Sequence, residues 1–368
     1  MKKTMLFSLL LFLFTTLFTY SQNIEKLKAE KYLAEKGEIT FTFKVNSSLE
    51  IANFTKDLSI IHFDPKTKTI KAWANEKQFK LFEDKNITYK VPKSENEVDA
   101  NLIYNSKTKA KESKLTRNML ANTLTFPVAN YPTYTEYAQQ MEDFETNYPT
   151  LVDFFSIGTT TKNDGKEILF VKISDNVNTD EVEPKILFTS SMHGDEIAGY
   201  PMMLSLIDYI LTVYNDTGHA DHARIKNLVE NTELWINPNA NPDGTYYGSP
   251  SNTSVTGARR ANHNGWDLNR NYPDNVAGPH PDGNPNYELE TQYFMALASN
   301  NNFVLSANFH GGIELVNYPF DNAYVSEYTH ADGNWFEFTG VEYATHAQND
   351  SDALGDFTYM KVYYDSNI

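Results

Sequence analysis

The sequence predicts an α/β fold with a mixed central sheet flanked by helices, preceded by a small α+β open-sandwich module. From about residue 126 onward, short apolar segments alternate with longer segments whose apolar residues recur at helical spacing. Residues 39–91 instead contain several short strand patterns and two short helical ones. The charge also differs between the two parts of the chain: residues 22–118 carry a net charge of +5, and residues 119–368 carry a net charge of −24. We therefore expect two folded parts.

The composition excludes several classes of protein. The 368 residues are 40% hydrophobic and 14% aromatic, which is enough apolar material for a large core and argues against wholesale disorder. The absence of cysteine excludes disulfides, thiolate metal sites and a cysteine nucleophile. A net charge of −17 argues against nucleic acid as a partner, because phosphate binding needs clustered Lys and Arg.

The first 21 residues have the pattern of a secretory signal peptide. Lys2 and Lys3 precede an apolar run at 5–18, and small residues end the segment at Thr19 and Ser21. The run is shorter than the ~20 residues that a spanning helix needs. We expect cleavage after Ser21, a secreted or periplasmic protein and no stable membrane span. An uncleaved anchor is the alternative.

Residues 22–91 predict a small α+β module. Apolar and polar residues alternate over 39–45, which is typical of a strand. In order, we expect a strand at 39–45, a helix at 49–58 capped by Ser47 or Ser48, a hairpin of strands at 60–63 and 69–73, a helix at 75–82 and a strand at 87–91. This β-α-β-β-α-β order predicts an open sandwich of four strands and two helices.

A linker follows the module. Residues 92–118 are polar, rich in lysine and poor in apolar side chains, so they cannot form a core. We expect an exposed linker over 92–125 that proteases can reach.

The larger part, residues 126–368, alternates strands and helices. We expect a helix at 134–148, strands at 151–157, 167–173 and 185–190, a long helix at 196–214, and strands at 233–237 and 303–309. This order predicts a largely parallel or mixed sheet, with functional residues at the carboxyl ends of its strands.

Two strand ends carry residues that bind metals. His193 and Glu196 follow the apolar strand at 185–190, and His310 follows the strand at 303–309 with two glycines behind it. Alone, the His-x-x-Glu spacing favours a structural interpretation, with a loop histidine and a helix-capping glutamate. Together, two histidines and a carboxylate would make a three-ligand site with an open fourth position, which is typical of catalytic zinc.

Arginines gather between these strands. Arg259, Arg260 and Arg270 fall within residues 257–273. A guanidinium group grips a carboxylate with two hydrogen bonds, so the cluster indicates an anionic partner. Ordinary surface ion pairs with the many Asp and Glu residues are the alternative.

Taken together, these segments resemble the zinc carboxypeptidase family, specifically its regulatory or N/E-type branch. The resemblance covers roughly residues 126–368, and its motifs appear in the family's order. They are His193-Gly-Asp-Glu196, Asn241-Pro-Asp-Gly244, Arg260-x-Asn-x-Asn-Gly265, Asp267-Leu-Asn-Arg-Asn-Tyr-Pro273, Ser306-Ala-Asn-Phe-His-Gly-Gly312 and Asn317-Tyr-Pro-Phe-Asp321. The module at 22–91 is similar in architecture to the pro-segments of secreted members.

The resemblance implies a metal site and a catalytic arginine. His193, Glu196 and His310 would hold one zinc ion per chain, and Arg260 would stabilise the oxyanion that forms during hydrolysis. The substrates would be the C-termini of peptides or proteins.

The resemblance also implies how the substrate would be held. Asn269 and Arg270 would clamp the free C-terminal carboxylate, which would make the protein an exopeptidase. Asp321 stands where the N/E branch places an acid that faces the terminal side chain, which suggests a preference for C-terminal Lys or Arg. A turn residue after Pro319 is the alternative interpretation of Asp321.

One departure from the family pattern concerns the general base. The family's glutamate on a late strand, and the tyrosine of a mobile loop, should come well after Asp321. The glutamates that follow, Glu327, Glu337 and Glu342, lack a matching strand-like context. The sequence is therefore interpreted either as a fragment of a longer protein, with these residues beyond 368, or as a chain without its proton-transfer residue.

Three functions remain open at this point. The first is a secreted zinc carboxypeptidase that removes a C-terminal residue, which would be basic. The second is a zinc amidase on the same fold that acts on cell-wall peptides or acyl-amino acids. The third is a catalytically inactive module that binds zinc and peptide C-termini.

Overall fold

The computed structural model describes most of both predicted parts. The described residues are 22–47, 50–93, 101, 103, 123–274, 283–312, 315–320, 329–350 and 361–362. The predicted signal peptide, most of the predicted linker and Asp321 lie outside them. The chain divides into two compact units, one of residues 1–94, 273–283 and 312–368, the other of residues 95–272 and 284–311.

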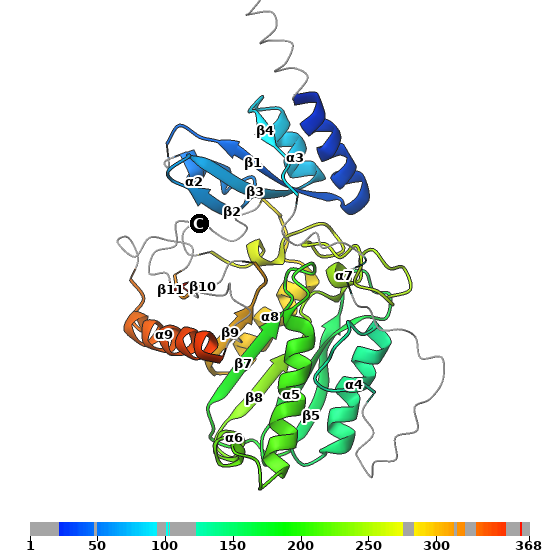
Figure 1. The fold of residues 1–368 in the computed structure, drawn as a ribbon, viewed down its shortest axis with the longest axis vertical. Coiled ribbons are helices and arrows are strands. Elements are labelled where there is room, and N and C mark those ends of the chain that lie inside the picture. The colour runs from blue at the N-terminus through cyan, green and yellow to red at the C-terminus, as the bar shows by residue number, and fades with distance from the viewer. Residues whose placement is uncertain are drawn as a thin grey trace, which may run out of the picture. The chain divides into compact units, whose positions relative to one another are not determined.

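The first unit contains a four-stranded antiparallel sheet (Figure 1). Its strands are β1 (Glu38–Lys44), β2 (Ser59–Asp64), β3 (Thr69–Asn75) and β4 (Tyr89–Lys90), in the order β2-β3-β1-β4. β2 and β3 form the predicted hairpin. All four strands were expected from the sequence.

Helices pack on this sheet through aromatic residues. α3 (Glu76–Glu83) begins after Asn75, whose side chain accepts a hydrogen bond from the backbone of Gln78. Phe79 and Phe82 of α3 contact Phe41 of β1, with ring centroids 5.0 and 4.7 Å apart. The predicted β-α-β-β-α-β order of this open sandwich is confirmed.

Two details differ from the prediction. α2 (Ile51–Phe54) is shorter than expected, and its N-cap position is Glu50, whose side chain makes no capping hydrogen bond, not Ser47 or Ser48. Residues 22–36 form an additional helix, which the sequence analysis did not predict. The side chain of Glu25 ties this helix to the module by accepting a hydrogen bond from the backbone N–H of Val91 at 2.6 Å.

Three further elements belong to the first unit. They are β10 (Leu315–Val316), α9 (Gly333–Asp350) and β11 (Lys361–Val362), and β10 pairs with β11 in parallel. Glu337 and Glu342 lie on α9, and Glu327 lies outside the described residues. In the part of the chain that the structure describes, no helix is both long enough and apolar enough to cross a membrane.

The second unit is built around a five-stranded mixed sheet. Its strands are β5 (Val152–Thr159), β6 (Glu167–Ile173), β7 (Lys185–Ser190), β8 (Glu233–Asn237) and β9 (Phe303–Phe309), in the order β5-β6-β8-β7-β9. β5, β6 and β8 pair antiparallel, whereas β7 runs parallel to both β8 and β9. The mixed sheet expected from the sequence is confirmed.

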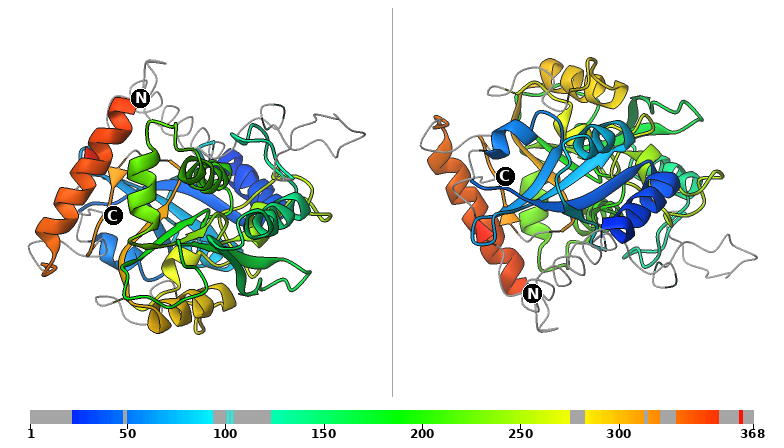
Figure 2. Two further views of the ribbon diagram at one scale, coloured as in Figure 1. Left: turned by 90° about the horizontal axis from the view of Figure 1, so that it is seen from below. Right: turned by 90° about the horizontal axis from the view of Figure 1, so that it is seen from above.

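Helices cover both faces of this sheet (Figure 2). α4 (Tyr134–Asn147), α5 (Gly199–Asn215) and α6 (His222–Val229) pack on one face and form the main apolar core there. α8 (Leu289–Asn300) lies on the other face, where Phe294 contacts Phe170 of β6. Two short helices, α7 (Pro242–Thr245) and η3 (Leu268–Arg270), lie in the loops of this unit.

The long helix begins later than predicted. α5 starts at Gly199, so Glu196 lies in a loop and not on the helix. Ser191 after β7 has a φ of +53°, a left-handed conformation that turns the chain away from helical geometry. Gly199 has no room for a Cβ, because that atom would overlap Ser190 Oγ.

The strand pairing brings the predicted metal ligands together. Ser190, the last residue of β7, pairs with Phe309, the last residue of β9. Because the strands are parallel, the chain leaves both of them at the same edge of the sheet. His193 and His310 follow these strand ends directly.

Candidate metal centre

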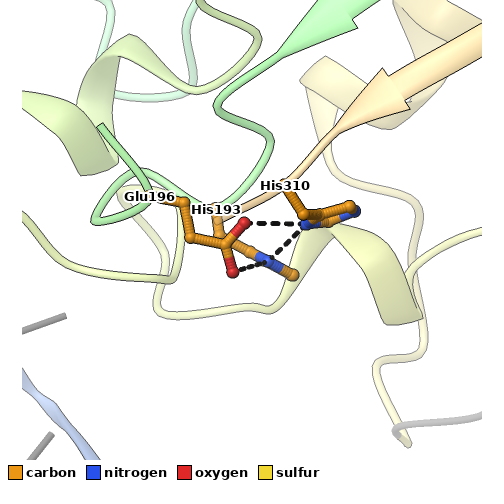
Figure 3. A group of neighbouring side chains, drawn as sticks. All are labelled: His193, Glu196 and His310. Carbon is orange, nitrogen blue, oxygen red and sulfur yellow. Dashed lines mark hydrogen bonds and ion pairs between the residues drawn. The ribbon is translucent and has the colours of Figure 1, made fainter. Parts of the chain in front are cut away.

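Three side chains converge where β7 and β9 end (Figure 3). His193 Nδ1 lies 2.8 Å from Glu196 Oε1, His310 Nδ1 lies 2.8 Å from Glu196 Oε2, and the two Nδ1 atoms are 3.1 Å apart. His193 and Glu196 are buried, and the side chain of His310 is 32% exposed. The structure therefore brings together the three ligands that the sequence predicted.

Hydrogen bonds within the loop aim His193 and Glu196 at the same point. Ser191 Oγ donates to the carbonyl of Glu196 at 3.0 Å, and the backbone N–H of Glu196 donates to the carbonyl of His193 at 3.2 Å. Gly194 sits inside this turn, and a Cβ there would overlap the backbone of Gly244. A glycine is needed because another backbone passes so close.

The glycine after His310 also has a local role. The backbone N–H of Gly311 donates to Glu196 Oε2 at 3.0 Å, and a Cβ on Gly311 would lie 3.2 Å from Glu196 Cβ. The contact fixes the Glu196 carboxylate from the side of β9.

The donor set fits zinc. Two imidazole nitrogens and a carboxylate leave a fourth position open in a tetrahedral site, as catalytic zinc requires. Atoms that share one tetrahedral zinc would lie about 3.4 Å apart, so the observed separations of 2.8 and 3.1 Å would need to open by about 0.3 to 0.6 Å. Without an ion and without a proton on either Nδ1 atom, the two imidazole lone pairs would face each other and the Glu196 carboxylate, which is unfavourable.

A buried carboxylate supports His193 from behind. Asp267 is fully buried, and its Oδ1 lies 3.0 Å from His193 Nε2. An ionised carboxylate can accept hydrogen bonds but cannot donate them, so Asp267 holds a proton on Nε2 of His193 and leaves Nδ1 as the nitrogen that can bind a metal. This arrangement turns Nδ1 of His193 toward Glu196 and His310.

The charges of the centre are coupled. Burial alone would raise the pKa of Glu196, but contact with His193 and His310 holds that pKa well below its usual value. Burial lowers the pKa of His310 below its usual value, and the nearby His193 lowers it further. Glu196 is therefore held as an anion beside imidazoles, which is the state that binds a cation.

Arg260 lies beside the three ligands. Its Nη1 is 3.6 Å from Glu196 Oε1, and its Nε donates to Asp267 Oδ2 at 2.9 Å. Although burial opposes the charge of Asp267, the Arg260 guanidinium and His193 hold the pKa of Asp267 well below its usual range. A fixed positive charge thus stands next to the site, where an oxyanion would develop.

The two residues predicted to hold a substrate carboxylate are close to Arg260 in sequence and structure. Asn269 and Arg270 lie in η3, whose first turn is capped by Asp267 Oδ1 accepting from the backbone of Asn269 at 2.9 Å. Asp267 thus links η3 to both His193 and Arg260. Asp321, the fourth residue predicted to contact substrate, lies outside the described residues.

Sequence reasoning assigned no role to two residues that organise the centre. Asp267 is one, and Asn241 is the other, because its buried amide donates to the carbonyls of Met192 and Arg260 at 3.1 and 3.2 Å. Asp267 and Asn241 each begin one of the family motifs, at 267–273 and 241–244. Each is a polar residue that the fold buries. The sequence does not show this burial, which is seen only once the partners of the two side chains are known.

Comparison with known proteins agrees with this geometry. A family model described as zinc carboxypeptidase matches residues 137–367. The chain is 35% identical over 180 residues to carboxypeptidase D of Homo sapiens, and 30% identical over 208 residues to the carboxypeptidase N catalytic chain of Rattus norvegicus. These matches cover 49% and 52% of this chain but 12% and 44% of the relatives. The chain thus spans less than half the length of either relative.

Solved structures share the fold. The carboxypeptidase A from Helicoverpa armigera superposes with a TM-score of 0.60, covering 90% of this chain and 82% of that one at 19% identity. Thrombin activatable fibrinolysis inhibitor superposes with a TM-score of 0.56, covering 89% and 83% at 14% identity. The residues that the family model matches make up more than half of the chain and include all three converging side chains. The chain therefore belongs to the zinc carboxypeptidase family.

Proposed function

We propose that this protein is a zinc-dependent carboxypeptidase that hydrolyses the C-terminal peptide bond of peptides, with one zinc ion per chain. The observation that carries the proposal is the convergence of His193, Glu196 and His310 within 3.1 Å of one another, with Arg260 beside them. When bound, zinc supplies a Lewis acid that polarises a carbonyl oxygen and activates water.

The surrounding residues would orient the substrate. Arg260 would donate hydrogen bonds to the oxygen on which negative charge develops, since its guanidinium is already fixed by Asp267. Asn269 and Arg270 would bind the terminal carboxylate, for which the planar guanidinium offers paired donors. Recognition of a free carboxylate is what would restrict cleavage to the last residue.

We further propose a preference for C-terminal Lys or Arg and a site of action outside the cytoplasm. The net charge of −24 over residues 119–368 supports the first point, because a strongly acidic segment attracts cationic substrates. Asp321 in the Asn-Tyr-Pro-Phe-Asp motif also supports it. The second point rests on the signal-peptide pattern of residues 1–21.

The decisive experiment measures release of the last residue from N-blocked dipeptides that end in Arg, Lys or Phe, with zinc and with a chelator. We expect zinc-dependent release that is faster for Arg and Lys. Arg270→Gln should raise KM strongly, whereas Arg224→Gln, which changes an exposed arginine of α6, should not. Peptide binding without turnover would indicate an inactive binding module. In a parallel assay on cell-wall peptides, release of a muropeptide fragment, with no amino acid released from the dipeptides, would indicate an amidase.

We also propose that the module at 22–91 acts as a pro-region that restrains the catalytic unit. The opposite net charges, +5 over residues 22–118 and −24 over residues 119–368, support this role. Proteolysis between residues 92 and 118 should then raise the rate of hydrolysis. Equal rates for the intact and the clipped protein would leave the module a folding or accessory role.

A further inference from the structure

Asn308 links the ligand His310 to the neighbouring strand. Thr189 Oγ1 donates to Asn308 Oδ1 at 3.0 Å, and Asn308 Nδ2 lies 3.1 Å from His310 Nε2. Thr189 and Asn308 are paired across β7 and β9, and Thr189 is 6% exposed. The link is therefore built by the sheet itself and not by a loop.

The hydrogen bonds of His310 identify its tautomer in the structure. A neutral imidazole has one N–H donor and one acceptor nitrogen. Because the Asn308 amide group donates to Nε2, the proton of His310 belongs on Nδ1, where it is donated to Glu196 Oε2 at 2.8 Å. A metal ligand must instead present the lone pair of Nδ1.

Metal binding therefore requires the proton of His310 on Nε2, facing Asn308. With the amide as it stands, an N–H of His310 would face an N–H of Asn308. Rotation of the Asn308 amide by half a turn removes this conflict, since Oδ1 would accept from Nε2 and Nδ2 would donate to Thr189 Oγ1. A hydroxyl accepts as readily as it donates, and the last torsion of asparagine is soft and roughly two-fold.

The other histidine ligand lacks this freedom. Asp267 accepts from His193 Nε2 and, as a buried carboxylate, can hold the imidazole in one tautomer. An asparagine can serve as donor or acceptor, so the two histidines of one site are supported in different ways.

We propose that Asn308, oriented by Thr189, is a positioning residue that holds His310 in the zinc-binding tautomer by turning its amide. This inference rests on the proposed zinc site and deepens it. Partners that hold a ligand imidazole typically contribute ten- to a hundredfold to metal affinity. We therefore expect Asn308→Leu, which has a similar size and no hydrogen bonds, to weaken zinc binding about ten- to a hundredfold.

The experiment measures the zinc dissociation constant of the full chain by competition with a chromophoric chelator. Asn308→Asp keeps an acceptor and should restore affinity to within about threefold of the unchanged protein, because a carboxylate suits Nε2–H. Thr189→Val should weaken binding by a smaller factor. The matched control is Ser306→Ala, two residues before Asn308 on the same face of β9.

A second readout follows the tautomer directly. With 15N-labelled histidine, zinc should move the His310 proton from Nδ1 to Nε2, and Asn308→Leu should reduce this shift. Asn308→Leu that binds zinc as tightly as the unchanged protein, or Asn308→Asp that binds as weakly as Asn308→Leu, would overturn the inference and leave the proposed function intact. An unchanged protein that binds no zinc would overturn both.

Discussion

Replacing Asp267 by Asn tests how the centre is held together. Asp267 Oδ1 lies 3.0 Å from His193 Nε2 and 2.9 Å from the backbone N of Asn269, while Oδ2 lies 2.9 Å from Arg260 Nε. An asparagine has one acceptor oxygen in place of two. If that oxygen stays with His193, Arg260 faces an amide donor; if it turns to Arg260, His193 must move its proton to Nδ1.

Each orientation of the new amide leaves one buried partner without its hydrogen bond, which lowers stability or zinc affinity. Removing one partner of a buried ion pair costs about 3–5 kcal/mol, and Arg260 here is 11% exposed with Asp267 at 0%. Loss of the partner behind a ligand histidine weakens metal binding about ten- to a hundredfold. We expect Asp267→Asn to lower the free energy of unfolding by about 3 kcal/mol and zinc affinity by at least about tenfold.

Two assays separate these effects. Denaturant unfolding gives the loss of stability, and competition with a chelator gives zinc affinity. Asp243→Asn is the matched control, because Asp243 is equally buried and its Oδ1 lies 3.1 Å from Lys166 Nζ, but it contacts none of the three ligands. It should lose stability and keep zinc affinity. Equal losses of zinc affinity in both variants, or none in Asp267→Asn, would refute the positioning argument.

Three other changes probe the scaffold. Burial raises the pKa of Asp208 on α5 to about 6, so its contribution to stability is complete below about pH 4 and is lost as the pH rises through 6. Asp208→Asn should therefore raise the free energy of unfolding by about 1–2 kcal/mol at pH 8 and change it little at pH 4, and an equal gain at both pH values would contradict the assignment. Gly194→Ala should weaken zinc binding at least tenfold in a chelator titration, because its Cβ would push the ligand turn against Gly244; unchanged affinity would mean that the turn relaxes freely. Phe41→Ala should destabilise the first unit by about 3–5 kcal/mol in denaturant, because the side chain is fully buried among aromatic rings, and a loss below about 1 kcal/mol would show that this core repacks.

The strands were predictable because burial leaves a direct trace in the sequence. β7 and β9 are short runs of apolar residues, and β1 alternates apolar and polar residues along a half-buried sheet. The helices α6 and α8 were not predicted, for an equally physical reason. α6 buries two apolar residues, and the residues that α8 buries are Glu290 and Thr291, so neither presents a clear apolar stripe.

The start of α5 shows a second limit. An apolar stripe predicted the helix, and most of that stripe is buried against the sheet. The residue at which the helix begins was not predicted. Its first residue, Gly199, packs against Ser190 Oγ. Helix propensity could not predict this contact, because Ser190 belongs to β7.

The possible chemistry could be predicted from the amino-acid sequence, because it contains the residue types of the ligand set and shows that they follow strand ends. Which atom of each ligand faces the others, and which groups lie behind them, depends on how the chain folds. His193 meets Asp267 across 74 residues and His310 across 117. The orientation of an imidazole depends on a hydrogen bond to its second nitrogen, and strand pairing and burial choose the partner for that bond.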